Sequence, residues 1–153
     1  MRPKLLDADA PEGIWNALVS QAEAAGFEVI RHRRRSENGY CDFSSKQIAV
    51  RPDVAPAQAV KTLIHELGHA LLHSEGPVAS REVAEVEVES VAYIVCDAIG
   101  LDTGNYSFPY VARRAGGATD VVRQTAERAI GCAKQILESL EVECSRLRDR
   151  QAS

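Results

Sequence analysis

The feature that most constrains this chain is a short run from Thr62 to His73 in which two histidines stand four positions apart. The run reads Thr-Leu-Ile-His-Glu-Leu-Gly-His-Ala-Leu-Leu-His and contains His65-Glu66-x-x-His69. On an α-helix, residues i and i+4 lie one turn apart on the same face, so both imidazoles can reach one metal ion at about 2.0–2.1 Å. Glu66 lies roughly 100° further round the helix, where it can reach a water beside the metal. The pattern is typical of zinc-dependent hydrolysis.

Apolar residues surround the motif on nearly every side of the predicted helix, which indicates that the helix is buried. They are Leu63, Ile64, Leu67, Ala70, Leu71 and Leu72. Burying two histidines and a glutamate without partners is costly, and a metal ion provides a partner for all three. We therefore predict His65 and His69 as zinc ligands and Glu66 as the catalytic base. His73 lies about 12 Å of helical rise beyond His65, so we predict for it a structural or supporting role.

A catalytic zinc usually takes three protein ligands, and the helix expected over residues 81–100, capped by Ser80, is predicted to supply the third. It carries four glutamates, namely Glu82, Glu85, Glu87 and Glu89, and its buried face is defined by Val88, Val91, Ala92 and Val95. Glu85 lies one turn before Val88 on that face and is the preferred ligand. Glu89 lies one turn after Glu85 and is expected to hold a ligand histidine by its free ring nitrogen. Glu82 and Glu87 are interpreted as a solvated acidic face.

The rest of the chain predicts an α+β fold. A capping box at Asp9–Glu12 starts a first helix, which Gly26 ends. Strand-like segments follow over 27–33, 40–43 and 46–50, with Asn38-Gly39 and Ser44-Ser45 as turns between them, so a small antiparallel three-stranded sheet is expected. Residues 101–117 form a connector. From Thr119 to about Arg148, apolar residues recur every three or four positions, which predicts a long amphipathic helix.

Length and composition indicate one domain over 1–153, with a helix and sheet in 1–54, the metal-site helices in 55–100, and the connector and last helix in 101–153. No apolar run is long enough to span a membrane and no signal peptide is recognised, so a cytoplasmic protein without a membrane partner is expected. Four cysteines without a C-x-x-C pair are interpreted as buried thiols. The basic run Arg31–Arg35 is a weaker candidate for nucleic-acid contact. The far end of the last helix could pair with another subunit.

The residues His65-Glu-Leu-Gly-His-Ala-Leu-Leu-His73, followed by Glu85-x-x-Val-Glu89-x-x-Ala-Tyr93, resemble the ImmA/IrrE family of zinc metallopeptidases. Residue by residue, the resemblance implies His65, His69 and Glu85 as ligands and Glu66 as the base. Val88 stands where the family usually has alanine. The match is also similar to the peptidase half of ArdC-like antirestriction proteins. It covers about residues 38–100.

The resemblance implies a zincin-like, gluzincin-type core in which the small sheet packs on the two metal-site helices. It further implies site-specific cleavage of a regulatory protein such as a transcriptional repressor, in stress response or mobile-element control. The alternative from another class is a non-catalytic, zinc-containing regulatory or DNA-associated module. An extended substrate is expected to pair with an exposed sheet edge such as 46–50. Tyr93, Tyr106 and Tyr110 are candidates for stabilising the oxyanion, and the substrate-binding residues stay unassigned.

Overall fold

The computed structural model describes residues 13–32, 37–74, 80–101 and 119–152, with the side chains of the last segment described over 122–142. This part of the chain contains the helices α1 (Ile14–Ala24), α2 (Pro56–His73), α3 (Arg81–Ala98) and α5 (Thr119–Ala152). It also contains the strands β1 (Glu28–Arg31), β2 (Gly39–Asp42) and β3 (Gln47–Val50). The expected capping box at 9–12, the connector at 102–117, and the tyrosines at 106 and 110 lie outside the described residues.

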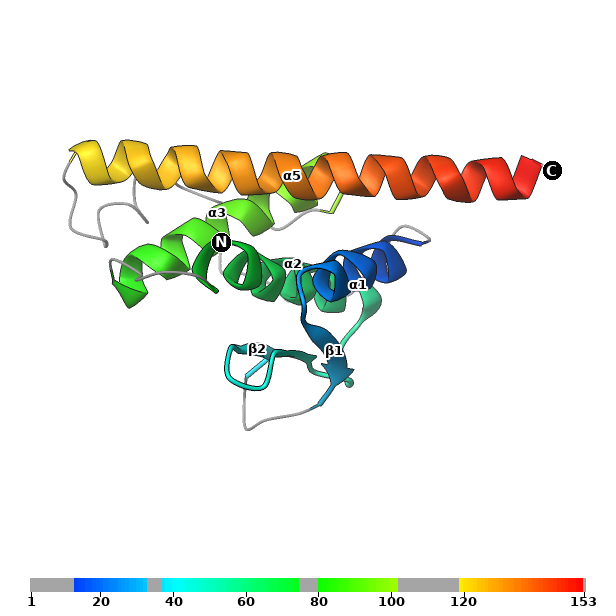
Figure 1. The fold of residues 1–153 in the computed structure, drawn as a ribbon, viewed down its shortest axis with the longest axis horizontal. Coiled ribbons are helices and arrows are strands. Elements are labelled where there is room, and N and C mark those ends of the chain that lie inside the picture. Colours follow the sequence, from blue (N-terminus) through cyan, green and yellow to red (C-terminus); the bar gives the residue numbers. More distant parts are fainter. Residues whose placement is uncertain (1–12, 33–36, 75–79, 102–118, 153) are drawn as a thin grey trace.

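The elements form three layers. Figure 1 shows α5 above a middle layer of α1, α2 and α3, with the sheet below that layer. Helix α2 contacts every other described helix as well as β2 and β3. The helix that carries the histidine motif is therefore the central element of the fold, as its apolar surroundings in the sequence predicted.

Local sequence signals account for the helix ends. Pro56 occupies the first turn of α2, where its missing N–H is not needed. The Ser80 hydroxyl accepts a 3.0 Å hydrogen bond from the Val83 N–H and caps α3. After both α1 and α3, a glycine with positive φ, Gly26 and Gly100, reverses the chain.

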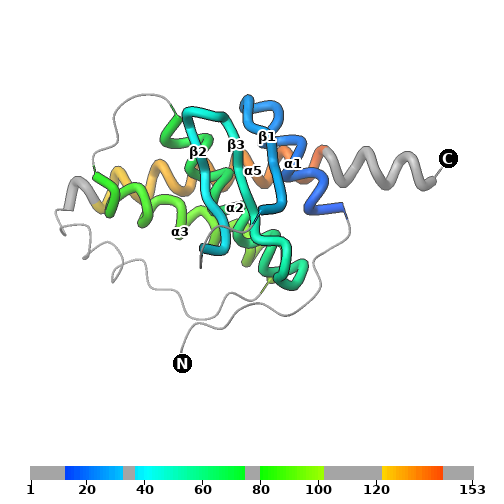
Figure 2. Tube along the Cα trace, turned by 90° about the horizontal axis from the view of Figure 1, so that it is seen from below, coloured from blue at the N-terminus to red at the C-terminus, as the bar shows by residue number. Residues whose placement is uncertain are grey.

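The sheet is mixed, so the expectation of an antiparallel sheet is wrong. The strand order is β1-β3-β2: β2 pairs antiparallel with β3, but β1 pairs parallel with the other side of β3. Figure 2 shows β3 between its two neighbours, on the side of α2 opposite α5. Residues 46–50 therefore form the centre of the sheet, and the expectation that they form an exposed edge is also wrong. The edge strands are β1 and β2.

The position of Gly39 explains why the antiparallel arrangement was expected. Asn38-Gly39 was interpreted as a hairpin turn, but Gly39 is the first residue of β2 and pairs with Val50. A β-carbon at position 39 would lie 2.5 Å from Thr62 Cγ2 and 2.7 Å from the Ala49 carbonyl oxygen. The glycine is thus needed for the close approach of β2 to α2, a tertiary requirement that resembles a turn signal in the sequence.

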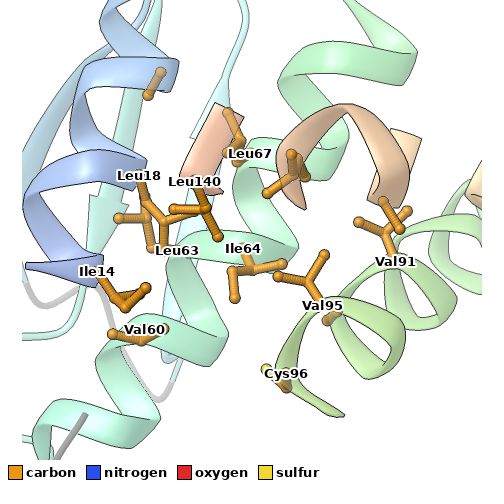
Figure 3. Packing of buried hydrophobic residues seen from close by; sticks show 14 of the residues in the cluster. Ile14, Leu18, Val60, Leu63, Ile64, Leu67, Val91, Val95, Cys96 and Leu140 are labelled. Atoms are coloured by element: carbon orange, nitrogen blue, oxygen red, sulfur yellow. The ribbon is translucent and has the colours of Figure 1, made fainter. Parts of the chain in front are cut away.

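The core lies between the helices and between the helix layer and the sheet. Figure 3 shows Ile14 and Leu18 of α1 meeting Val60, Leu63 and Ile64 of α2, with side chains of α3 and Leu140 of α5 completing the cluster. Leu63, Ile64 and Leu67 are fully buried. Burying each large apolar side chain stabilises the fold by roughly 1.5–3 kcal/mol. This packing fixes α2, and with it the histidine motif that α2 carries.

Among the described helices, none combines the length and apolar character needed to cross a bilayer. The described cysteines, Cys41, Cys96 and Cys132, are free thiols; Cys96 and Cys132 are buried, as expected, whereas Cys41 is only partly buried. The side chain of Cys144 lies outside the described residues. The single domain over 1–153 and an oligomer formed through the last helix stay predictions.

Candidate metal centre

Helix α2 presents two imidazoles on one face. The rings of His65 and His69 lie edge to face with their centroids 5.3 Å apart, as the i, i+4 spacing predicts. Both side chains are partly exposed, whereas the neighbouring apolar residues are buried. The helix therefore directs two ring nitrogens toward one accessible point.

Helix α3 brings a carboxylate to the same point. One oxygen of Glu85 lies 3.3 Å from His65 Nε2, and the other lies 3.1 Å from His69 Nε2. Gly68 favours this approach, because a β-carbon there would lie 3.1 Å from Val88 Cγ1 on α3 and would crowd it. A glycine inside the motif thus lets the two helices pack closely enough for Glu85 to reach both histidines.

These three side chains fit a zinc ion. Their ligand atoms all lie within 4.8 Å of one another. Ligands at about 2.0–2.1 Å from a tetrahedral zinc are separated by about 3.3 Å, close to the two nitrogen–oxygen distances that Glu85 makes. Two imidazoles and one carboxylate are also a donor set that catalytic zinc sites use. No other group of three such residues converges in this way within the described residues.

The charges at this point are strongly coupled. Hydrogen bonds from His65 and His69 hold the pKa of Glu85 far below its usual range, although burial opposes them. Burial lowers the pKa of His65, but the hydrogen bond with Glu85 and the negative charges of Glu66, Glu85 and Glu89 outweigh it and raise that pKa above its ordinary value. The negative surroundings favour a cation between these side chains.

Glu66 lies beside the ligand atoms but below the surface. Glu66 is 7% exposed. Burial raises the pKa of its carboxyl above the usual value, and the charges of His65 and His69 only partly offset this rise. No hydrogen bond or ion pair joins Glu66 to another described residue. Cys41 of β2 lies close enough to feel the charge of Glu66: burial, then the charges of Glu66 and Asp42, raise the pKa of its thiol to about 12. Glu66 is thus a carboxylate of raised basicity at the side of the site that faces β2.

His73 supports His69 from behind. Its Nδ1 lies 2.9 Å from Nδ1 of His69, on the side of that ring facing away from Glu85. This contact agrees with the supporting role expected of His73. Glu89, for which the sequence predicted such a role, is exposed and makes no hydrogen bond to either ligand histidine within the described residues. Its charge acts on His65 through space.

Glu87 is buried, so its interpretation as a solvated side chain is wrong. Its side chain is 3% exposed and accepts hydrogen bonds from His73 and from Arg128 of α5. Burial raises the pKa of Glu87, but these hydrogen bonds and the charge of Arg128 lower it below the usual value. The prediction assumed that α3 has one buried face. In the structure α3 packs against both α2 and α5, and Glu87 lies where the two contacts meet, between His73 and Arg128.

The sequence did not predict the contact of Arg128 with Glu87. In the sequence Arg128 is one of many charged residues on a long amphipathic helix, and nothing local distinguishes it. The available signal was the third histidine of the motif, His73, because a buried histidine needs a partner for its second nitrogen and that partner needs a counter-charge. Tyr93 is partly exposed, and its part in stabilising the oxyanion stays a prediction.

Comparison with known proteins finds one family model and one curated relative that match the chain. Residues 22–98 match the sequence model of Peptidase_M78, the IrrE N-terminal-like domain. A Bacillus anthracis protein described as uncharacterized is 31% identical over 121 residues, which cover 71% of this chain. The chain spans 20% of the length of that relative. No solved structure matches the chain.

Proposed function

Because the chain belongs to the Peptidase_M78 family of IrrE N-terminal-like domains, we propose that it is a zinc-dependent peptidase. The family points to metal-dependent cleavage of peptide bonds. The single observation that carries the proposal is the convergence of His65, His69 and Glu85 beside the buried carboxylate of Glu66. A purely structural metal site has no use for such a carboxylate.

In the proposed site, His65 and His69 would hold zinc through their Nε2 atoms and Glu85 would hold it through its carboxylate. When bound, zinc supplies a Lewis acid that lowers the pKa of a water and polarises the peptide carbonyl. The carboxylate of Glu66 would accept a proton from the attacking water and then deliver it to the leaving nitrogen. Burial suits Glu66 to both steps, because it raises the pKa of the carboxyl toward the pH at which it must accept and release a proton.

The substrate is proposed to bind in an extended conformation along β2. This strand is an edge of the sheet, and its Gly39 and Cys41 face the helix that carries Glu66. A peptide that adds to β2 gains backbone hydrogen bonds and lies next to the base. The proposed substrate is a regulatory protein such as a repressor, in the cytoplasm, and for this the support is the family resemblance and the free thiols alone.

The alternative of a DNA-associated module gains no support from the described residues. Its feature was the basic run that begins at Arg31. The Arg31 guanidinium donates to the carbonyl oxygens of Val50 and Arg51 and lies 4.9 Å from the ring centre of Trp15. Arg31 thus fastens β1 to the end of β3. Residues 33–35 lie outside the described part of the chain.

The test begins with elemental analysis of protein purified without added metal, and continues with a proteome-derived peptide library read by mass spectrometry. The wild-type chain is expected to carry about one zinc and to cut a defined set of peptides. The matched control is Glu66→Gln, which keeps the shape of the site and is expected to keep zinc but to cut none of those peptides. A wild-type chain that neither carries nor takes up zinc, or a Glu66→Gln variant that cuts the same peptides, would overturn the proposal.

A further inference from the structure

We propose that Glu87 and Arg128 are positioning residues of the metal centre, acting on His69 through His73. The inference rests on the proposed function, because it takes zinc at His69 as given. It adds to the site a residue of α5, which lies beyond the family match at residues 22–98.

The contacts form an unbroken chain. His69 Nε2 faces Glu85, and His69 Nδ1 lies 2.9 Å from His73 Nδ1. His73 Nε2 in turn lies 2.9 Å from Oε1 of Glu87. Arg128 donates through Nε to the other oxygen of Glu87. Each ring therefore has both of its nitrogens engaged, and the carboxylate has both of its oxygens engaged.

Only one proton arrangement of this chain is compatible with a metal on His69. The Nε2 atom must offer its lone pair to the metal, so the proton of the neutral ring sits on Nδ1. That proton is donated to His73 Nδ1, which leaves the proton of His73 on Nε2, donated to Glu87. A carboxylate that accepts from a histidine in this way fixes both the tautomer and the ring orientation. Here a second imidazole lies between the carboxylate and the ligand.

Burial makes the chain depend on Arg128. The side chains of His73 and Glu87 are each 3% exposed, so the charge of Glu87 is largely removed from water. A buried carboxylate without a counter-charge is strongly unfavourable. Arg128 supplies that charge from a side chain that is itself half exposed. Its second nitrogen, Nη2, donates to the Leu72 carbonyl oxygen at 3.1 Å, in the last turn of α2, which has no partner of its own within the helix.

One guanidinium thus joins three helices at the back of the site. Arg128 comes from α5, Glu87 from α3, and Leu72 and His73 from the end of α2. The last turn of α2 is the turn directly after His69. Fixing that turn fixes the position of the His73 ring, which is hydrogen-bonded to His69. It therefore also fixes the direction in which His69 Nε2 presents its lone pair.

Zinc affinity separates positioning from simple bracing. A residue that only braces the helices changes the stability of the metal-free protein and leaves its affinity for zinc unaltered. A residue that orients a ligand changes the affinity, typically by 10–100-fold for a hydrogen-bond partner of a ligand. The absorption bands of bound Co²⁺ give a second readout, because they report the geometry of the ligands independently of any cleavage.

The experiment compares the full chain with Glu87→Gln, Arg128→Ala and the double variant, using zinc titration against a chromophoric chelator, Co²⁺ spectra, and thermal unfolding without metal. Lys134→Ala is the matched control, because Lys134 is another exposed cation of α5 and makes no contact with Glu87. Glu87→Gln keeps the shape of the side chain, but its amide group opposes the donors of Arg128.

We expect zinc to bind about 10–100-fold more weakly to each single variant, with shifted Co²⁺ bands, and with wild-type affinity in Lys134→Ala. The double variant should bind little more weakly than Glu87→Gln alone, because both substitutions break one chain. Arg128 is partly exposed, so its variant keeps the test decisive even if Glu87→Gln does not fold. Wild-type zinc affinity in a folded Arg128→Ala would overturn the inference. A wild-type chain that binds no zinc would instead overturn the proposed function.

Discussion

Val88 of α3 packs directly over Gly68 of α2, so closely that a β-carbon on residue 68 would lie 3.1 Å from Val88 Cγ1 and 3.4 Å from Val88 Cβ. This contact lies between the two ligand-bearing turns, since His69 follows Gly68 and Glu85 lies one turn before Val88. The spacing of the two helices at this contact therefore sets how far Glu85 must reach to meet the histidines. Val88 stands where the family usually has alanine, and its larger side chain leaves less room for a β-carbon at residue 68.

The first prediction concerns Gly68→Ala. Alanine in a helix interior is favoured over glycine by up to about 1 kcal/mol, but overpacking against Val88 costs about 1–3 kcal/mol, so a net loss of stability is expected. Gly131→Ala in α5 is the control, because nothing lies within 4 Å of the new β-carbon. Only the gain in helix propensity should remain there, so this variant should be more stable than wild type. Urea unfolding of the metal-free protein measures both. In the double variant with Val88→Ala, the loss at residue 68 should shrink, and an unchanged loss would contradict the contact.

The second prediction concerns Gly39→Ala at the start of β2. The new β-carbon would lie under 3 Å from both a side-chain carbon of Thr62 and the backbone oxygen of Ala49, and backbone cannot move aside cheaply. The expected cost is about 1–3 kcal/mol in urea unfolding. Combining it with Thr62→Ser, which removes the nearer carbon, should recover only part of that loss, since the carbonyl stays in place. A Gly39→Ala variant as stable as wild type would show that β2 does not need this approach to α2.

The third prediction concerns the ligand set. Replacing His65, His69 or Glu85 with alanine should each reduce the zinc content well below one per chain in protein purified without added metal, because two remaining ligands hold the ion weakly. Glu82→Ala, which removes an exposed carboxylate from the same helix as Glu85, is the control and should keep the wild-type content. Elemental analysis against protein concentration gives the answer. Full zinc content in Glu85→Ala would require another third ligand.

The fourth prediction is a pH dependence at the β2–β3 turn. The hydroxyl of Ser44 and the backbone N–H groups of Ser45 and Ser44 donate to Asp42 and lower the pKa of its carboxyl below the ordinary value. Stability from such a group is present above the unfolded pKa of about 3.9 and is lost as pH falls through the lower folded pKa. Wild type should therefore unfold at a higher temperature than Asp42→Asn at neutral pH. That difference should narrow steadily below about pH 4. A difference that stays constant down to pH 3 would contradict this role of Asp42.

Local signals in the sequence predicted the helices that carry the site. The bounds Pro56–His73 follow from a proline at the first turn and from continuous apolar spacing, and Ser80 identifies the start of α3 by its capping hydroxyl. The family also follows from these two helices, because the motif and the glutamate after it lie within about one helical hairpin. Such features depend on neighbours in the chain, which is why they can be read from it.

The strand order and the burial of Glu87 depend on tertiary packing, so they could not be predicted from local sequence. The order of the strands depends on which side of β3 is free to receive β1, and no local pattern records that. Glu87 lies between apolar neighbours, Val86 and Val88, yet its burial could be recognised only with α5 in place on the second side of α3. The partner of Glu87 lies 41 residues further along the chain. Charged residues buried between distant helices are a class that spacing within one helix cannot reveal.

The position of β3 between a near strand and a distant one also determines an order of events as the chain folds. A four-residue turn joins β2 to β3, so these two strands can pair on the microsecond timescale of hairpin formation. β1 reaches the other side of β3 from 19 residues away and must close a longer loop to do so. Until it arrives, β3 exposes a row of unpaired amides and carbonyls that any other extended chain can join. We therefore expect the pairing of β1 to cover the one side of β3 that β2 leaves open, and so to lower the tendency of the unfinished sheet to join other chains.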